Sequence, residues 1–306
     1  MQITATVEPG SFFDLGRHDP TLIRLREDGA ERALPFALME RLMKSGVPYA
    51  EHARALASDL VHVASTAFDW FDSDLPRQIA DEINLSNYEI VEHTVERHAA
   101  LIQALERLAT VHPDGFARVH EFVRGFLWVG LKPGVRTSSL TSSSDPALPY
   151  VIVFSDKARH HIPPNTVSDE PSHLFLAENI LHEGVHQSVS FHVLQHQVFA
   201  DDYDSKTSPK IEIAWRATQG EARNQFWEVD RAFHATCVYN QLLRFRRAEL
   251  DRDDLTASER ASFQAAYNEG MPAVQYLMDQ LELLGANFTN HGRELLAGLR
   301  DQTDHL

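Results

Sequence analysis

The chain is short of cysteine, of basic residues and of long hydrophobic runs, and each shortage excludes a class of protein. Cys237 is the one cysteine among 306 residues, so no disulfide can form within the chain. No apolar run approaches the roughly 20 residues that a bilayer-spanning helix needs. The first residues also lack the basic and apolar stretches of a secretory signal. We therefore expect a cytoplasmic protein with no membrane partner.

Basic residues are outnumbered by acidic ones. The 28 Lys and Arg residues stand against 44 Asp and Glu, which gives a formal net charge of -16. A molecule so negative is repelled by phosphate backbones and by anionic lipid, so we expect no nucleic acid partner. The acidic surface is expected mainly to keep the protein soluble, and a neutral or basic peptide remains acceptable as a partner.

Apolar spacing predicts a mainly α fold of the α+β class, in one domain over residues 1–306. The N-terminal part, 1–124, carries several stripes of apolar residues at helical spacing. The break at His112-Pro-Asp-Gly ends one helix and precedes another. The helices expected in this part span 33–43, 49–71, 85–108 and 116–123.

Residues 125–250 are expected to form the metal-site core, where a small β-sheet lies next to a metal-binding helix. Short apolar runs bounded by glycine or proline predict buried strands there. The expected elements are strands at 125–131, 148–155 and 211–215, loops at 136–146 and 201–210, and a long helix at 220–247. The C-terminal part, 251–306, is expected to hold helices at 258–284 and 288–299, the first kinked or split at Pro272 and Gly270.

The pentad His-Glu-Gly-Val-His at 182–186 is the most informative motif in the chain. It lies in a stretch that predicts a helix, which Ser172 or Asp169 can cap. A four-residue step on a helix places two imidazoles on one face, where both reach one metal ion. Glu183 lies beside them as a carboxylate that can handle a proton, so it is the candidate catalytic residue.

Two histidine ligands, His182 and His186, do not hold a catalytic metal without a third from elsewhere. His234 is the preferred third ligand because it lies among apolar neighbours on a later helix. His192 and His196 follow the pentad by six residues or more, about 9 Å or more along the helix axis, which is too far to share the ion. The remaining alternatives are three downstream glutamates, Glu212, Glu221 and Glu228.

The metal decides the chemistry, and the spacing does not choose between two metals. Two histidines, a glutamate and a water favour zinc and hydrolysis, with Glu183 as general base. Three histidines, or two with a carboxylate, also hold Fe(II) with positions open for oxygen. A guanidinium fork suits the distal carboxylate of 2-oxoglutarate, although it pairs equally well with carboxylates on helix faces. The arginines in question are Arg216, Arg223 and Arg231.

Several short segments follow one another between residues 125 and 250. They are the serine-rich stretch from Ser138, the strand from Tyr150, the pentad, Trp215-Arg and Phe233-His-Ala-Thr-Cys-Val-Tyr. This order resembles the HExxH-motif proteins found with ribosomally made, post-translationally modified peptides. The resemblance implies an Fe(II)- and 2-oxoglutarate-dependent peptide β-hydroxylase whose substrate is a precursor peptide.

Carried over to this sequence, the resemblance implies His182, His186 and His234 as metal ligands. It implies an arginine for the 2-oxo acid, for which Arg231 is preferred over Arg223. Three functions stay open at this point: the oxygenase, a zinc metallopeptidase, and a non-catalytic scaffold that binds peptides. Metal content and peptide turnover separate the three, and the oligomeric state is left open.

Overall fold

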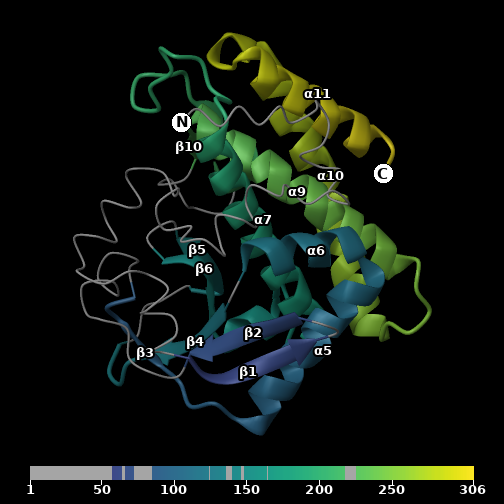
Figure 1. Cartoon of the computed structure of the whole chain (residues 1–306). Helices are drawn as coiled ribbons and strands as arrows, with labels where there is room; N and C mark the ends of the chain where they lie inside the picture. Colours follow the sequence, from purple (N-terminus) through teal and green to yellow (C-terminus); the bar gives the residue numbers. More distant parts are fainter. Residues whose placement is uncertain are drawn as a thin grey trace.

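A computed structural model describes most of the chain from residue 57 onward as a small mixed sheet covered by helices (Figure 1). The mainly α architecture with a small sheet, which the sequence predicts, is confirmed. The described residues are 57–63, 66–71, 85–123, 125–135, 140–145, 148–163, 165–217 and 225–306. The helix expected at 33–43 lies outside them.

Six strands form the main sheet. Five run in the order β1-β2-β4-β6-β5, and β3 pairs with β4. β2, β4 and β6 are parallel to one another, whereas β1 and β5 pair at the two ends of this order as antiparallel strands. The strands are β1 Ala57–Val63, β2 Thr66–Phe71, β3 Tyr88–Ile90, β4 Gly125–Leu131, β5 Ser142–Asp145 and β6 Leu148–Phe154. The two strands expected at 125–131 and 148–155 are therefore confirmed.

The helix expected at 49–71 is wrong over its described part, which is the hairpin of β1 and β2. Val61 and Val63 are buried on one strand, and Phe68 and Trp70 are buried on the other. This is the two-residue period of a strand. The helical spacing was read across Leu60 and Val63, which lie on β1, and Phe68, which lies on β2. Apolar residues from two strands therefore happened to match the spacing of one helix face.

The polar loop expected at 136–146 is wrong in part, because Ser142–Asp145 forms β5. Clusters of serine are typical of loops, and no periodic apolar pattern marks this strand. It is a strand because β6 supplies its hydrogen-bonding partner, with Ser142 opposite Phe154 and Ser143 opposite Val153. Tertiary pairing here overrides local sequence preference.

Helices α5, Val95–Val111, and α6, Pro113–Phe122, meet at His112 as the sequence predicts. α5 begins later than expected, because β3 occupies the first part of 85–108. The side chain of Thr94 fixes this start by accepting a hydrogen bond from the backbone N–H of Arg97.

Helix α7, His173–Gln195, carries the pentad and runs through the middle of the molecule, in contact with α5, α6 and α9 (Figure 1). The hydroxyl of Ser172 caps it by accepting a hydrogen bond from the backbone N–H of Leu174. Glu178 on α7 forms an ion pair with Arg246 on α9, Val229–Leu250, and both side chains are fully buried. These contacts hold the pentad in a fixed place in the core.

The C-terminal helices pack beyond α7, since α10 lies on α9 and α11 lies on α10 (Figure 1). α9 begins nine residues later than the helix expected at 220–247, after a short strand. α10 is one continuous helix with Pro272 inside it, so of the expected kink or split the split does not occur, and the kink stays a prediction. The remaining elements are β7 His161–Ile162, β8 Thr166–Val167, β9 Ile211–Glu212, α8 Ala214–Ala217, β10 Phe226–Trp227, α10 Ala257–Leu283 and α11 Asn290–Asp304.

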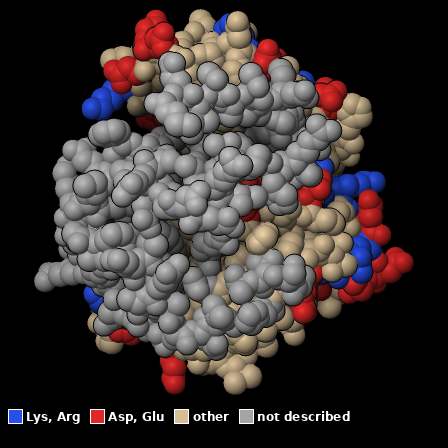
Figure 2. All heavy atoms as spheres, viewed as in Figure 1, with Lys and Arg blue, Asp and Glu red and all other residues tan. Residues whose placement is uncertain are grey.

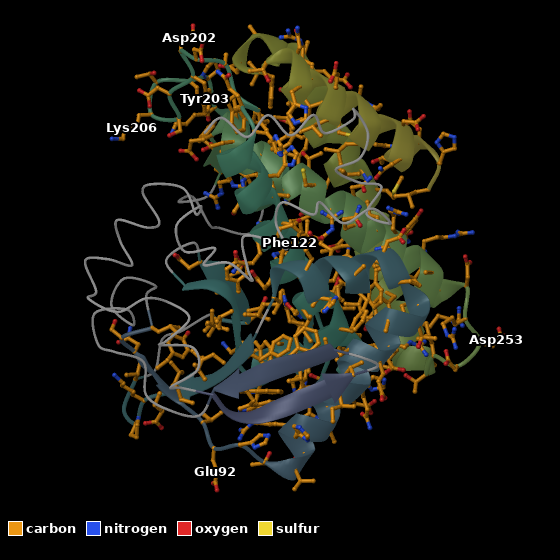
Figure 3. The ribbon with its side chains drawn as sticks, viewed as in Figure 1. Glu92, Phe122, Asp202, Tyr203, Lys206 and Asp253 are labelled. Atoms are coloured by element: carbon orange, nitrogen blue, oxygen red, sulfur yellow. The ribbon has the colours of Figure 1, made fainter. Side chains whose placement is uncertain are left out.

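Where described atoms are visible at the rim of the face in Figure 2, acidic and basic side chains lie beside one another. Figure 3 places Asp202, Tyr203 and Lys206 on the loop after α7, which confirms the loop expected at 201–210, and Asp253 on the turn between α9 and α10. Among helices in the described ranges, none has the length and apolar character needed to cross a bilayer.

Candidate metal centre

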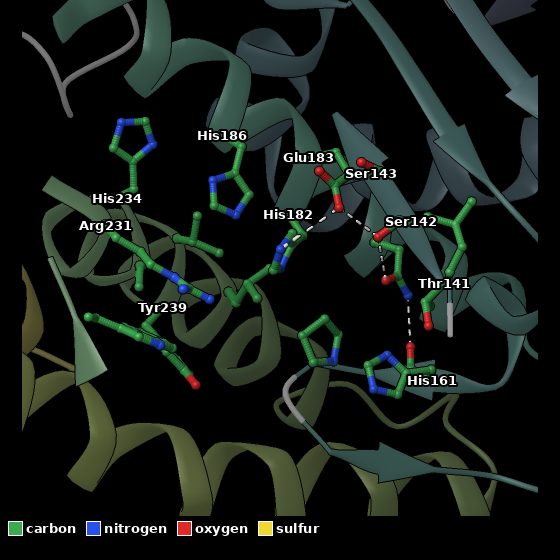
Figure 4. Close-up of a pocket in the computed structure, with 17 residues that line it drawn as sticks. Thr141, Ser142, Ser143, His161, His182, Glu183, His186, Arg231, His234 and Tyr239 are labelled. Atoms are coloured by element: carbon green, nitrogen blue, oxygen red, sulfur yellow. Dashed lines mark hydrogen bonds and ion pairs between the residues drawn. The ribbon is translucent and has the colours of Figure 1, made fainter. Parts of the chain in front are cut away.

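α7 places the two pentad histidines side by side. The ring centroids of His182 and His186 lie 4.8 Å apart, as the four-residue step on a helix requires (Figure 4). Both side chains are half-buried, and both line one pocket of about 640 Å³. The predicted pairing of these two imidazoles is therefore present in the fold.

α9 brings the third predicted histidine to the same pocket. The ring of His234 lies beyond that of His186, with 6.1 Å between their centroids, and the two rings are nearly parallel (Figure 4). The two helices that carry these residues pack directly on each other. Packing of α9 on α7 thus brings together histidines that are 48 residues apart in the sequence.

Burial keeps all three imidazoles neutral at neutral pH. It lowers the pKa of His182 and of His186 to about 3, and the pKa of His234 to about 4. A neutral imidazole offers a lone pair, which is the form that binds a metal ion. The Nδ1 atom of His182 is buried and has no hydrogen-bond partner among the described residues. The chemistry of this donor set therefore fits a metal ion.

The three histidine side chains are not arranged around one common metal position. No three His, Cys, Asp or Glu side chains within the described ranges are placed so that they could hold one ion. His182, His186 and His234 would have to turn about their side-chain bonds to share one. The part of the prediction that concerns the metal itself therefore stays a prediction.

Glu183 faces β5, where two serine hydroxyls hold its carboxylate. The hydroxyl of Ser142 donates to Oε1 and that of Ser144 donates to Oε2, each at 2.7 Å. The Glu183 side chain is almost fully buried, and its Oε1 lies 3.9 Å from the Nε2 atom of His182 (Figure 4). The carboxylate therefore lies at the wall of the pocket, close to the imidazole of His182.

The opposite wall of the pocket comes from α9 and from the residues just before it. Arg231 lines the pocket, and its guanidinium lies 4.9 Å from the ring centre of Trp227, in a cation–π contact. Figure 4 shows Arg231 and Tyr239 on the side of the pocket that faces away from Ser142 and Ser143. A cationic side and a carboxylate side thus flank the histidines.

The other candidate ligands lie elsewhere. Glu212 accepts a hydrogen bond from Gln225, and Glu228 forms an ion pair with Lys210; neither lines the pocket. Glu221 and Arg223 lie outside the described residues, as does the side chain of Arg216. Of the predicted arginines, Arg231 is thus the one that the described structure brings to the site.

His192 and His196 form a separate group with His291 of α11. The Nε2 atoms of His192 and His291 lie 2.9 Å apart, and the ring centroids of His192 and His196 lie 4.4 Å apart. This agrees with the expectation that helix geometry keeps both residues away from the pentad. The sequence offered no sign that His291 would join them, since it lies 99 residues further along the chain.

Sequence reasoning missed several residues of the pocket wall. Asn179 is one turn before Glu183 on α7, and its side-chain amide donates to the backbone carbonyls of His161, Ala158 and Phe175. Ser142 belongs to the serine-rich stretch, whose composition gives no indication that it reaches the site. The four-residue step from Asn179 to Glu183 predicts that the two side chains share one face of the helix. No pattern in the sequence predicts that β5 contacts Glu183.

Comparison of the sequence with protein-family models and with curated proteins gave no match. The family resemblance described above therefore remains an expectation, and the functional argument depends on the geometry of the pocket.

Proposed function

We propose that the chain is an Fe(II)- and 2-oxoglutarate-dependent oxygenase that hydroxylates a β-carbon of a ribosomally made precursor peptide. The observation that supports this most is the presence of Arg231 in the same pocket as His182, His186 and His234. A 2-oxo acid needs a metal ion at one end and a cation for its distal carboxylate at the other. This pocket offers residues for both.

In this proposal the three neutral histidines hold Fe(II), and the guanidinium of Arg231 orients the 2-oxo acid. The contact of Arg231 with Trp227 limits the positions of its guanidinium before a carboxylate binds. When bound, the iron and the 2-oxo acid supply the activation of oxygen and the oxidation of the substrate. The cavity of about 640 Å³ has room for the acid and for one substrate side chain, and its apolar wall of Val238 and Leu242 limits water.

The direct test is anaerobic purification followed by metal analysis and oxygen-uptake measurements. We expect the protein to retain iron and to consume oxygen only when 2-oxoglutarate and a peptide substrate are both present. Bound zinc with peptide cleavage would replace this proposal with the peptidase. A protein that binds no metal when iron, zinc and cobalt are supplied would instead favour a non-catalytic peptide-binding scaffold.

The zinc metallopeptidase is kept as a second candidate because the Glu183 carboxylate lines the same pocket, 3.9 Å from His182. A general base must lie within hydrogen-bond reach, about 2.6–3.2 Å, of the water that the ion activates, and a water bound next to His182 would lie beside this carboxylate. We expect Glu183→Gln to separate the two candidates. A peptidase should lose nearly all activity with its metal retained, whereas the oxygenase should keep part of its oxygen uptake.

A further inference from the structure

We propose that Ser142 and Ser144 act as a clamp that keeps the Glu183 carboxylate away from the metal ion and so preserves open coordination positions. This inference rests on the proposed function, because only an oxygenase needs several positions open for the 2-oxo acid and oxygen. It gives a role to the serine-rich stretch of the sequence. It also gives Glu183 a place in a site where no base is needed.

The hydrogen bonds that define the clamp are short, and there is one for each carboxylate oxygen. Each carboxylate oxygen of Glu183 accepts one serine hydroxyl at 2.7 Å, so both oxygens are directed at β5. Hydrogen bonds to an ionised acceptor are among the strong ones. The side chain of Glu183 is 6% exposed, so water does not compete freely for these oxygens.

Strand pairing holds the clamp in place. Ser142 Oγ also lies 3.1 Å from the side-chain oxygen of Asn179, but a hydroxyl has one proton, and the shorter contact of 2.7 Å gives that proton to Glu183. β5 is paired with β6, which places Ser142 opposite Phe154, whereas Ser144 lies at the register irregularity between Ser143 and Asp145. Both serines are therefore presented by one short strand of the sheet.

Without the clamp, Glu183 is a competing ligand. Its Oε1 lies 3.9 Å from His182 Nε2, and a carboxylate oxygen is a good ligand for Fe(II), Co²⁺ and Zn²⁺. Rotation of this side chain toward the histidines would add a fourth protein ligand. That ligand would occupy a position that the 2-oxo acid needs.

The experiment measures Co²⁺ binding by the full chain, prepared free of metal. In the Ser142→Ala/Ser144→Ala variant we expect Co²⁺ to bind about tenfold more tightly than in the unchanged protein, because a carboxylate replaces a water. The visible Co²⁺ spectrum should change in position and intensity for the same reason. With Co²⁺ bound, 2-oxoglutarate should bind about tenfold more weakly.

Further variants show whether Glu183 carries the effect. Adding Glu183→Ala to the double alanine variant should return the spectrum and the 2-oxoglutarate affinity to those of Glu183→Ala alone. Ser142→Thr/Ser144→Thr keeps both hydroxyls and should leave the spectrum unchanged. Thr303→Val removes a buried hydroxyl far from the pocket, one that bonds Leu299 and Asn240, and it serves as the control for a general loss of stability.

The outcomes are distinct. A double alanine variant whose Co²⁺ spectrum and affinity match the unchanged protein overturns the clamp and leaves the proposed oxygenase standing. An effect that persists in the triple variant also overturns it, because the change then does not pass through Glu183. Absence of Co²⁺ binding in the unchanged protein overturns the proposed function and the clamp together. If the double alanine variant does not fold, Ser144→Ala alone frees Oε2 and should give a smaller change of the same sign.

Discussion

Each pentad histidine is held in the neutral form that binds a metal, because burial lowers its pKa far below neutral pH. The pKa values of His182 and His186 near 3, and of His234 near 4, mean that no proton has to be displaced at neutral pH. The position of each ring depends on the side chains packed around it. Replacing the three histidines one at a time should therefore weaken metal binding by different amounts.

Replacement of the histidines one at a time tests the ligand set. We expect His182→Ala and His186→Ala each to abolish metal binding, because each removes half of the adjacent pair on α7, and His234→Ala to weaken it by about 10-fold or more. Metal content by elemental analysis and affinity by chelator competition are the measurements. His305→Ala, which changes an exposed histidine, is the control. An unchanged metal content in His234→Ala would remove this residue from the site.

Replacement of Arg231 tests the binding of the 2-oxo acid. We expect Arg231→Ala to raise the KM for 2-oxoglutarate by about 10- to 100-fold, because a paired guanidinium and carboxylate contribute about 1.5–3 kcal/mol. Arg231→Lys should recover only part of this, since an ammonium cannot form the paired contact. Arg247→Ala, an exposed arginine on the same helix, should leave KM unchanged. Equal KM values in all three variants would count against Arg231.

At the scale of elements, the glycine inside the pentad lets α7 and α6 approach closely. A Cβ atom on Gly184 would lie 2.9 Å from Cγ2 of Val119, a fully buried residue of α6. A valine has one strongly preferred rotamer in a helix and cannot easily move aside. The close position of α6 therefore requires a residue without a side chain at Gly184, inside the pentad.

The pair Gly184→Ala and Gly298→Ala tests this contact. Alanine is favoured over glycine in a helix by about 1 kcal/mol, so Gly298→Ala, with open space around it on α11, should raise the free energy of unfolding by about that amount. Gly184→Ala should instead lower it by about 1 kcal/mol, because overpacking outweighs the same gain. Urea unfolding measures both. A stabilised Gly184→Ala would show that α6 yields at little cost.

At the scale of the whole molecule, buried histidines make stability depend on pH. Burial lowers the pKa of His112 to about 4, and the pKa values of His182, His186, His192 and His234 are lowered in the same way. Each of these groups has a pKa near 6.5 in the unfolded chain. The unfolded chain therefore binds more protons than the folded one below that pH, and acid favours unfolding.

We expect the metal-free protein to be most stable above pH 6.5 and to lose stability as the pH falls toward 4. His112 alone contributes about 3 kcal/mol to this loss, from a difference of about 2.5 between its pKa values in the two states. His112→Gln should flatten the dependence of Tm on pH in this window, and His305→Gln, at an exposed position, should not. Parallel pH profiles for the two variants would contradict this account.

Short-range rules in the sequence determined the helix of the pentad, its cap at Ser172, the break at His112 and the strands β4 and β6. Each of these depends on residues within a few positions of one another. The sequence also named His234 among its candidate third ligands and Arg231 among three candidate arginines, and the fold places these two residues in the pocket. Whether they bind an ion and a 2-oxo acid stays a prediction.

Only the tertiary structure decided the rest, because the deciding contacts join distant segments. The apolar spacing of the segment that forms β1 and β2 predicts a helix, and only the pairing of the two strands shows that it is a hairpin. The serines of β5 reach Glu183 from about 40 residues away because β6 holds that strand in place. Local sequence preference determines which backbone conformation a segment adopts. Packing and long-range strand pairing determine which side chains come into contact, and a binding pocket is built from such contacts.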